Sequence, residues 1–155
     1  MISSSSNILI LSLNNIAIQA GKIIMTYYKN LQEISLKDDQ SPLTEADLAS
    51  NSFIMNELKN IDHSIPILSE ETLVGWSKRK NWNTYWLVDP LDGTKEFINR
   101  NGEFTVNIAL IENNTPILGV IYAPALSVLY YGSKKRGSFK IVCEDKIDSL
   151  SNSVQ

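Results

Sequence analysis

The stretch WLVDPLDGTKEF, residues 86–97, begins as an apolar run and ends in acids, a proline and a glycine. Its first three residues are typical of a strand that enters a hydrophobic core. Asp89 and Asp92 follow on one tight loop, and two carboxylates placed together are unfavourable unless a cation neutralises them. The stretch therefore predicts a buried strand whose end carries a cation site.

The residues ahead of this strand predict two helices. Apolar side chains recur at helical spacing from about residue 6 to residue 29, which indicates a long amphipathic helix packed on a core. Residues 35–43 are polar and include a proline, as expected of a loop. Thr44 and the three residues after it resemble a capping box that opens a second helix, which we expect to end near Asn60.

The residues after the strand predict a meander of further strands. Residues 103–111 alternate between apolar and polar side chains, and three more apolar runs follow at 117–124, 126–132 and 138–142. Short turns between successive strands imply antiparallel pairing. The expected fold is α+β, with two N-terminal helices packed on a largely antiparallel sheet in one domain over residues 1–155.

The composition is that of an ordinary globular protein, with 43% hydrophobic and 20% charged residues. The net charge of −3 gives no general attraction to nucleic acid. No uninterrupted apolar run is long enough to span a bilayer, and residues 1–21 lack the basic start of a signal peptide. The single Cys143 cannot form an internal disulfide. We therefore expect a cytoplasmic protein with no nucleic-acid partner and no integral membrane segment; peripheral membrane association stays open.

Two further acids follow another apolar run. Glu70 and Glu71 follow the apolar run at residues 65–68 after one serine, and if this run pairs with the strand at 84–88, three or four carboxylates gather at one edge of the sheet. Oxygen ligands with no histidine or cysteine nearby suit Mg²⁺, with Mn²⁺ as an alternative. The loop after the second of these strands is short enough for the carbonyl of Leu91 to join the coordination.

The residues after the acids favour a phosphate group. Gly93 lets the backbone approach a ligand closely, and residues 94–97 are expected to form the first turn of a short helix. Backbone N–H groups at a helix start bind phosphate oxygens, so the stretch predicts metal-assisted hydrolysis of a phosphate ester. Simpler interpretations remain, because DPLDGT is also good turn sequence and a pair of glutamates is often solvated surface.

Asp47 has two interpretations. At the third position of the second helix, a carboxylate would favour the helix dipole. Alternatively, Asp47 and Thr94 together would polarise the attacking water as a base. The sequence leaves both open.

Several separated motifs resemble, in the right order, the inositol monophosphatase superfamily of Mg²⁺-dependent, lithium-sensitive phosphatases. The residues after DGT are most similar to its bacterial 3'(2'),5'-bisphosphate nucleotidase branch, the CysQ type, and the resemblance runs from the first helix to about Tyr131. The motifs are SPLTEAD (41–47), PILSEE (66–71), WLVDPLDGTKEFINRNGEFTVNIALI (86–111) and PILGVIYAP (116–124).

The resemblance implies the first half of the sugar-phosphatase fold of this superfamily and a set of metal ligands. Glu70, Asp89 and the Leu91 carbonyl would hold one Mg²⁺, and Asp89 with Asp92 a second, with a third ion as a further option. The implied reaction hydrolyses a small phosphorylated nucleotide, 3'-phosphoadenosine 5'-phosphate, to AMP and phosphate. In bacteria this recycles a by-product of sulfate assimilation.

The resemblance also implies roles in catalysis and substrate binding. Asp47 and Thr94, with Glu70, would orient the nucleophilic water, and Lys37 would approach the phosphate or a third metal. The substrate contacts would come from Glu70, Leu91, Asp92, Gly93 and Thr94.

One departure from the superfamily is large. Its members continue into a second α/β half with a metal-ligating aspartate in a Trp-Asp-x-Ala-Ala-type motif, which this sequence lacks. We therefore expect an N-terminal domain without its C-terminal half, impaired activity, and self-association through the surface left uncovered. Two alternatives stay open: an inositol or sugar monophosphatase, and a non-catalytic metal-binding remnant.

Overall fold

The protein is seen in a computed structural model that describes residues 3–30 and 42–143. Lys37 and the polar tail at 145–155, for which the sequence predicts fraying, lie outside the described residues. The elements are α1 (Ser3–Asn30), α2 (Pro42–Ile61), β1 (Ile67–Ser69), α3 (Trp76–Arg79), β2 (Thr84–Asp92), α4 (Thr94–Ile98), β3 (Thr105–Glu112), β4 (Thr115–Ala123), the 3₁₀ turn η1 (Pro124–Leu126), β5 (Val128–Ser133) and β6 (Gly137–Val142).

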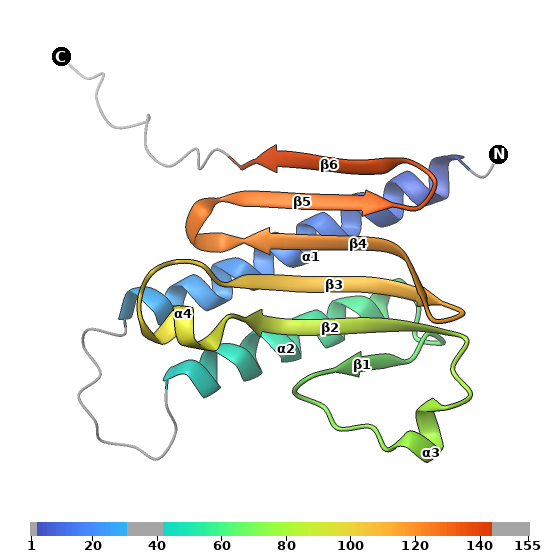
Figure 1. Cartoon of the computed structure of the whole chain (residues 1–155), viewed down its shortest axis with the longest axis horizontal. Helices are drawn as coiled ribbons and strands as arrows, with labels where there is room; N and C mark the ends of the chain where they lie inside the picture. The colour runs from blue at the N-terminus through green and yellow to red at the C-terminus, as the bar shows by residue number, and fades with distance from the viewer. Residues whose placement is uncertain (1–2, 31–41, 144–155) are drawn as a thin grey trace.

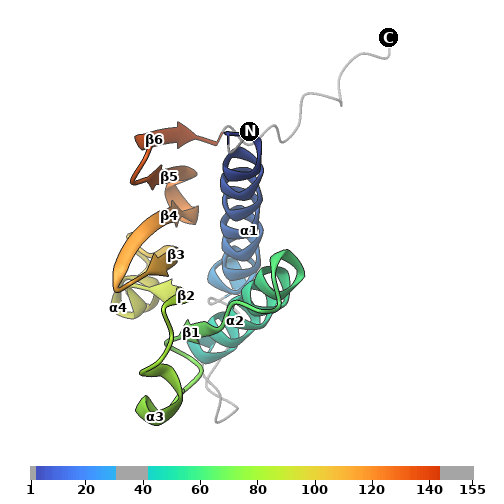
Figure 2. The ribbon, with the colours of Figure 1, turned by 90° about the vertical axis from the view of Figure 1, so that its right-hand side faces the viewer.

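The described residues form two layers (Figures 1 and 2). Six strands make one sheet in the order β1-β2-β3-β4-β5-β6, and α1 and α2 both lie on the same face of it. Every neighbouring pair is antiparallel except β1 and β2, which run parallel. The predicted α+β class and largely antiparallel sheet are confirmed. The sequence prediction did not state the direction of the first pair, although the gathering of acids at one edge requires it to be parallel.

The first helix packs on the sheet through an apolar stripe at helical spacing. Leu13, Ile16, Ala20 and Ile24 in this stripe are buried. Gly21 permits the closest approach, because a Cβ built there would lie 2.5 Å from the Tyr122 ring on β4. The stripe therefore fixes how α1 lies across the sheet.

One helix among the described residues is long and apolar enough, by length and composition, to cross a membrane. This is Asn7–Asn30 of α1, with a mean hydropathy of 1.6. The core helix of a soluble protein and a signal sequence pass the same test, so the finding is weak evidence for a membrane span.

The second helix begins earlier than its sequence suggests. It starts at Pro42, and proline is favoured in the first turn because its missing N–H has no intrahelical partner there. Thr44 therefore lies within the helix, and the predicted capping box is wrong. Asp47 is consequently one turn further into the helix than expected, where interaction with the helix dipole is weaker.

The strands mostly follow their sequence pattern. The buried positions of β3 alternate as predicted, and Phe104 just before it is buried too. On β2, Trp86 and Val88 enter the core, but Leu87 is 43% exposed and points to the face without helices. The expectation that all three apolar residues enter the core is therefore wrong for Leu87, because successive side chains of a strand point to opposite faces.

Candidate active site

The ends of β1 and β2 meet at one edge of the sheet because the two strands run parallel. Ser69 pairs with Val88, and the N–H of Glu70 donates to the Val88 carbonyl oxygen at 3.1 Å. Glu70 and Asp89, the next residues on the two segments, therefore lie close together. This neighbourhood is the condition on which the predicted gathering of carboxylates depended.

Asp89 is crowded by other acids. Burial is the largest cause that raises the pKa of Asp89 to about 7, followed by the negative charges of Glu70 and Asp92 and a hydrogen bond with Glu70. A hydrogen bond from the Leu91 backbone acts on the pKa in the opposite direction. Deprotonation of Asp89 is thus unfavourable until positive charge is supplied.

Asp47 joins these acids from α2. Burial raises the pKa of Asp47 to about 7, helped by the charge of Glu71, a hydrogen bond with Glu71, and the charges of Asp89 and Glu70. We use the name acid cluster for Asp47, Glu70, Glu71, Asp89 and Asp92. Three separate segments of the chain contribute to it.

The acid cluster fits a divalent cation in its chemistry. Oδ1 of Asp47 and Oδ1 of Asp89 are buried without a hydrogen-bond partner among the described residues. A buried acceptor left unpaired costs about 1–3 kcal/mol, which coordination would offset. Within the described part of the chain, no three acidic, histidine or cysteine side chains are already arranged as a ligand set. Metal binding at the acid cluster would therefore require these side chains to move closer together.

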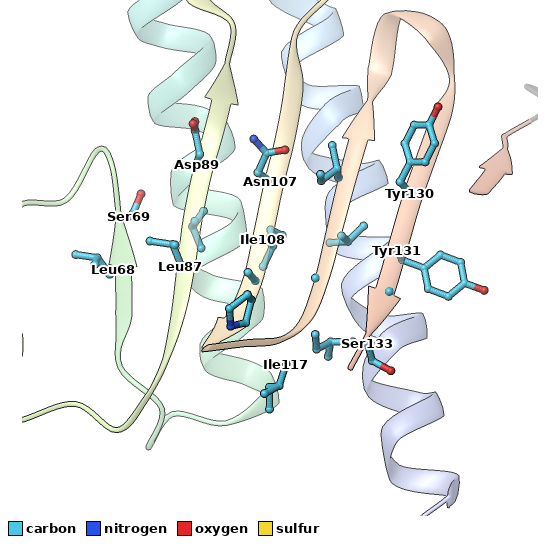
Figure 3. A pocket seen from close by; sticks show the side chains of 18 of the residues that line it. Leu68, Ser69, Leu87, Asp89, Asn107, Ile108, Ile117, Tyr130, Tyr131 and Ser133 are labelled. Carbon is cyan, nitrogen blue, oxygen red and sulfur yellow. The ribbon is translucent and has the colours of Figure 1, made fainter. Parts of the chain in front are cut away.

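Asp92 is held from the neighbouring strand. The side-chain amide of Asn107 on β3 donates to Oδ2 of Asp92 at 3.0 Å, and Thr105 donates to Oδ1 of Asn107 at 3.1 Å. Asn107 pairs in register with Asp89, and the two side chains lie side by side on neighbouring strands (Figure 3). One amide thus lies between two members of the acid cluster on the face without helices.

Gly93 connects the end of β2 to α4 in a left-handed conformation, with φ of +94°. A Cβ there would lie 3.0 Å from the Glu103 carbonyl oxygen and 3.1 Å from Phe104 Cα. Glycine is therefore required by backbone conformation and by packing, in addition to any ligand. Thr94 begins α4, the short helix predicted from the sequence, and is exposed.

An aromatic cluster anchors α4. The buried Phe97 ring lies 5.3 Å from both Tyr28, at the end of α1, and Phe104, centroid to centroid. The Arg100 guanidinium lies 5.0 Å from the Tyr28 ring centroid and donates to the Tyr28 carbonyl oxygen at 3.1 Å. The segment after Gly93 is therefore fixed against α1 and β3.

The predicted site residues are not all brought together to the same degree. Asp47 lies with Glu70 and Asp89, as a shared site requires. The pairing of Asp47 with exposed Thr94 stays a prediction, as does metal coordination by the Leu91 carbonyl. Three polar residues beside the acid cluster were missed, namely Ser50, Asn51 and Asn107. The sequence feature that could have revealed these three residues is a polar side chain at a position where an apolar side chain would also fit the pattern of the helix or strand.

Comparison with known protein families shows the family of the chain. The model of the inositol monophosphatase family matches residues 7–151, nearly the whole chain. The chain belongs to the inositol monophosphatase family. Its acid-bearing segments lie within the matched region.

Within the inositol monophosphatase family, the chain is similar to proteins named 3'(2'),5'-bisphosphate nucleotidase CysQ. It is 53% identical to the one from Salmonella typhimurium, over 77% of this chain and 49% of that protein. It is 49% identical to the one from Buchnera aphidicola of Acyrthosiphon pisum, over 78% of this chain and 51% of that protein. The chain thus spans about half the length of the curated relatives it matches.

Two solved structures share the fold of this chain. CysQ from Bacteroides thetaiotaomicron is 40% identical with a TM-score of 0.80, covering 96% of this chain and 54% of that one. The protein suhB from Bartonella henselae is 26% identical with a TM-score of 0.70, covering 85% of this chain and 50% of that one. The predicted resemblance to part of an inositol-monophosphatase fold is therefore confirmed.

Proposed function

We propose that this chain contributes the metal-binding half of a Mg²⁺-dependent phosphomonoesterase that acts on 3'(2'),5'-bisphosphate nucleotides. The observation that carries the proposal is the acid cluster, in which buried oxygens of Asp47 and Asp89 have no hydrogen-bond partner among the described residues. The names of the relatives supply the substrate class. The reaction would convert 3'-phosphoadenosine 5'-phosphate and water to AMP and phosphate, within sulfur metabolism.

The ligands proposed for the metal are Glu70, Asp89, Asp92 and the Leu91 carbonyl. Two or three Mg²⁺ ions, or Mn²⁺ in their place, would supply positive charge that activates water and stabilises the leaving oxygen. Positive charge beside these carboxylates would also lower the raised pKa of Asp89, so that it stays ionised at neutral pH.

The chain's own residues would move the proton and orient the phosphate. Asp47, which is half-buried beside Glu70 and Asp89, would accept a proton from the attacking water. Thr94 would help orient that water, and the backbone N–H groups of Gly93 and Thr94 would donate to phosphate oxygens. Glu70, Leu91 and Asp92 complete the proposed substrate contacts.

The remaining proposals concern the uncovered face beside the site, the location of the protein and the alternative functions. The face of the sheet without helices exposes apolar side chains beside Asp89, and we propose that it is covered in the active protein or drives self-association. We propose a cytoplasmic location. An inositol or sugar monophosphatase is the alternative among enzymes, and a non-catalytic metal-binding remnant is the alternative outside them.

Phosphate release at saturating Mg²⁺ tests the proposal. Because the chain spans half of its relatives, we expect measurable turnover of 3'-phosphoadenosine 5'-phosphate well below the ordinary range of ~1–10³ per second. Asp47→Asn should lower the rate by a further ~10²–10⁴-fold with unchanged circular dichroism. Asp62→Asn, just past the far end of α2 and only half-buried, is the matched control and should leave the rate unchanged.

The pattern of substrates separates the alternatives. Faster hydrolysis of inositol 1-phosphate than of the nucleotide would favour the inositol monophosphatase activity. Metal binding without release from any phosphomonoester would favour the remnant. Unchanged turnover in Asp47→Asn, with a lowered melting temperature, would make Asp47 a structural residue.

A further inference from the structure

Ser50 and Asn51 are buried polar residues one turn beyond Asp47 on α2. Residues three and four apart lie on one face of a helix, so both share the face of Asp47. Further along the same face, Ile54 and Leu58 are apolar and fully buried. Buried polar side chains cost free energy unless they are hydrogen-bonded, so the partners of Ser50 and Asn51 indicate what these residues do.

Ser50 holds the segment that carries Asp89 and Asp92. Its hydroxyl donates to the Pro90 carbonyl oxygen at 3.0 Å, and both residues are buried. The register of β2 on β3 shifts between Asp89 and Asp92, and Pro90 has no N–H to donate there. Ser50 therefore fixes the backbone at the point where the strand ladder is interrupted.

Asn51 holds the other acid-bearing segment. The Ser69 hydroxyl donates to Oδ1 of Asn51 at 2.7 Å, and the N–H of Glu71 donates to the Ser69 hydroxyl at 3.3 Å. The Asn51 amide donates to the Thr72 hydroxyl at 3.5 Å. Asn51 is thus bonded to the residues on either side of the Glu70–Glu71 pair.

We propose that Ser50 and Asn51 are positioning residues that set the spacing of the acid cluster. A single turn of α2 presents Asp47, holds the Asp89–Asp92 segment through Ser50 and holds the Glu70–Glu71 pair through Asn51. The inference rests on the proposed function, because spacing matters to function only where the acids bind a cation. Groups that orient metal ligands typically change metal affinity ~10–100-fold when removed.

Calorimetric titration with Mn²⁺ at pH 7.5, using the whole chain, tests the inference. We expect Ser50→Ala to weaken Mn²⁺ binding ~10–100-fold. Ser50→Thr, which keeps the hydroxyl, should restore binding close to that of the unchanged chain. Exposed Ser52→Ala is the surface control, and Ile54→Val is a buried control that loosens α2 without touching the acid cluster. Both controls should bind Mn²⁺ normally.

The outcomes separate the positioning role from the metal site. Equal Mn²⁺ affinity in Ser50→Ala and the unchanged chain, with binding lost in Asp89→Asn, would overturn the inference and leave the proposed function standing. No Mn²⁺ binding by the unchanged chain would overturn both. Weakening in Ile54→Val as large as in Ser50→Ala would show that helix packing alone is responsible. Should Ser50→Ala not fold, Ser50→Cys and Asn51→Ala are titrated instead, with weaker binding again expected.

Discussion

The two faces of the sheet differ in what covers them. On the face under α1 and α2, residues such as Val88, Ile108 and Val120 belong to the core and are almost completely buried. On the other face, Leu87, Ile121 and Tyr130 are 43%, 47% and 46% exposed. Both faces carry apolar side chains, so hydrophobicity alone does not show which face forms the core. The core lies on the face that α1 and α2 cover.

We call the face of the sheet without helices the open face. Along this face the charge changes from acidic at one end to basic at the other, which we call the charge gradient. A cross-strand row runs from Asp89 through Asn107, Ile121 and Tyr130 to Lys140. The Lys140 ammonium lies 5.5 Å from the Tyr130 ring centroid. An apolar centre between an acidic end and a basic end is suited to an interface rather than to permanent exposure.

Substitution of isoleucines on the two faces should give the largest difference in the free energy of unfolding. Ile108→Ala removes a fully packed side chain and should lower the free energy of unfolding by ~2–5 kcal/mol. Ile121→Ala, on the open face, should cost far less because water already reaches that side chain. Urea unfolding of both variants at low protein concentration measures the difference. Equal losses would mean that the open face is covered in solution.

Glycines give a second matched pair. Gly21→Ala places a methyl group 2.5 Å from the Tyr122 ring, so α1 or the ring must shift, and overpacking of this kind costs ~1–3 kcal/mol. Gly119→Ala on β4 meets only ordinary contacts, the nearest being 3.6 Å from the Ile108 carbonyl oxygen. We expect it to be neutral or to raise stability by up to ~1 kcal/mol. Thermal unfolding distinguishes the two, and a stable Gly21→Ala would contradict the packing of α1 described above.

The sequence predicted the helices and the later strands because their apolar periodicity is local. It did not predict that β1 runs parallel to β2 or that Leu87 faces outward, since an apolar run lacks the alternation that reveals a face. The acids of the site were predicted because each pair follows an apolar strand in the sequence. Ser50 and Asn51 were missed because their role depends on the segments that pack over them, which lie up to 40 residues away.

The acid cluster joins the two faces, since Asp47 approaches it from α2 and Asp89 lies on the open face. Both pKa values are raised from 3.8 to about 7 in the metal-free fold. The folded state therefore keeps protons that the unfolded state releases above about pH 4. The stabilising contribution is complete below pH 4 and is lost as pH rises through about 7.

Without divalent ions, stability should consequently fall between about pH 4 and about pH 7. Urea unfolding in EDTA measures this fall, and Asp89→Asn should reduce it because one of the two groups no longer titrates. Mg²⁺ should restore stability mainly at the higher pH. Asp62→Asn is the control, because the hydrogen bonds of Ser64 lower the pKa of Asp62 rather than raise it. A pH dependence that is unchanged in Asp89→Asn would contradict the crowding of acids around Asp89.

The smallest effect on stability, and the most direct test of the open face, is expected from Ile121→Glu. A surface substitution usually changes stability by less than ~0.5 kcal/mol. Ile121 lies at the centre of the charge gradient, so two copies packed face to face about a two-fold axis would bring the acidic end of each against the basic end of the other. The same symmetry would place two introduced glutamates close together and oppose association.

Sedimentation equilibrium should therefore show a mass that rises with concentration for the unchanged chain and stays monomeric for Ile121→Glu. Thr115→Glu, exposed at the start of β4, is the matched control and should still associate. A monomeric unchanged chain at high concentration would mean that the open face does not bind a second copy.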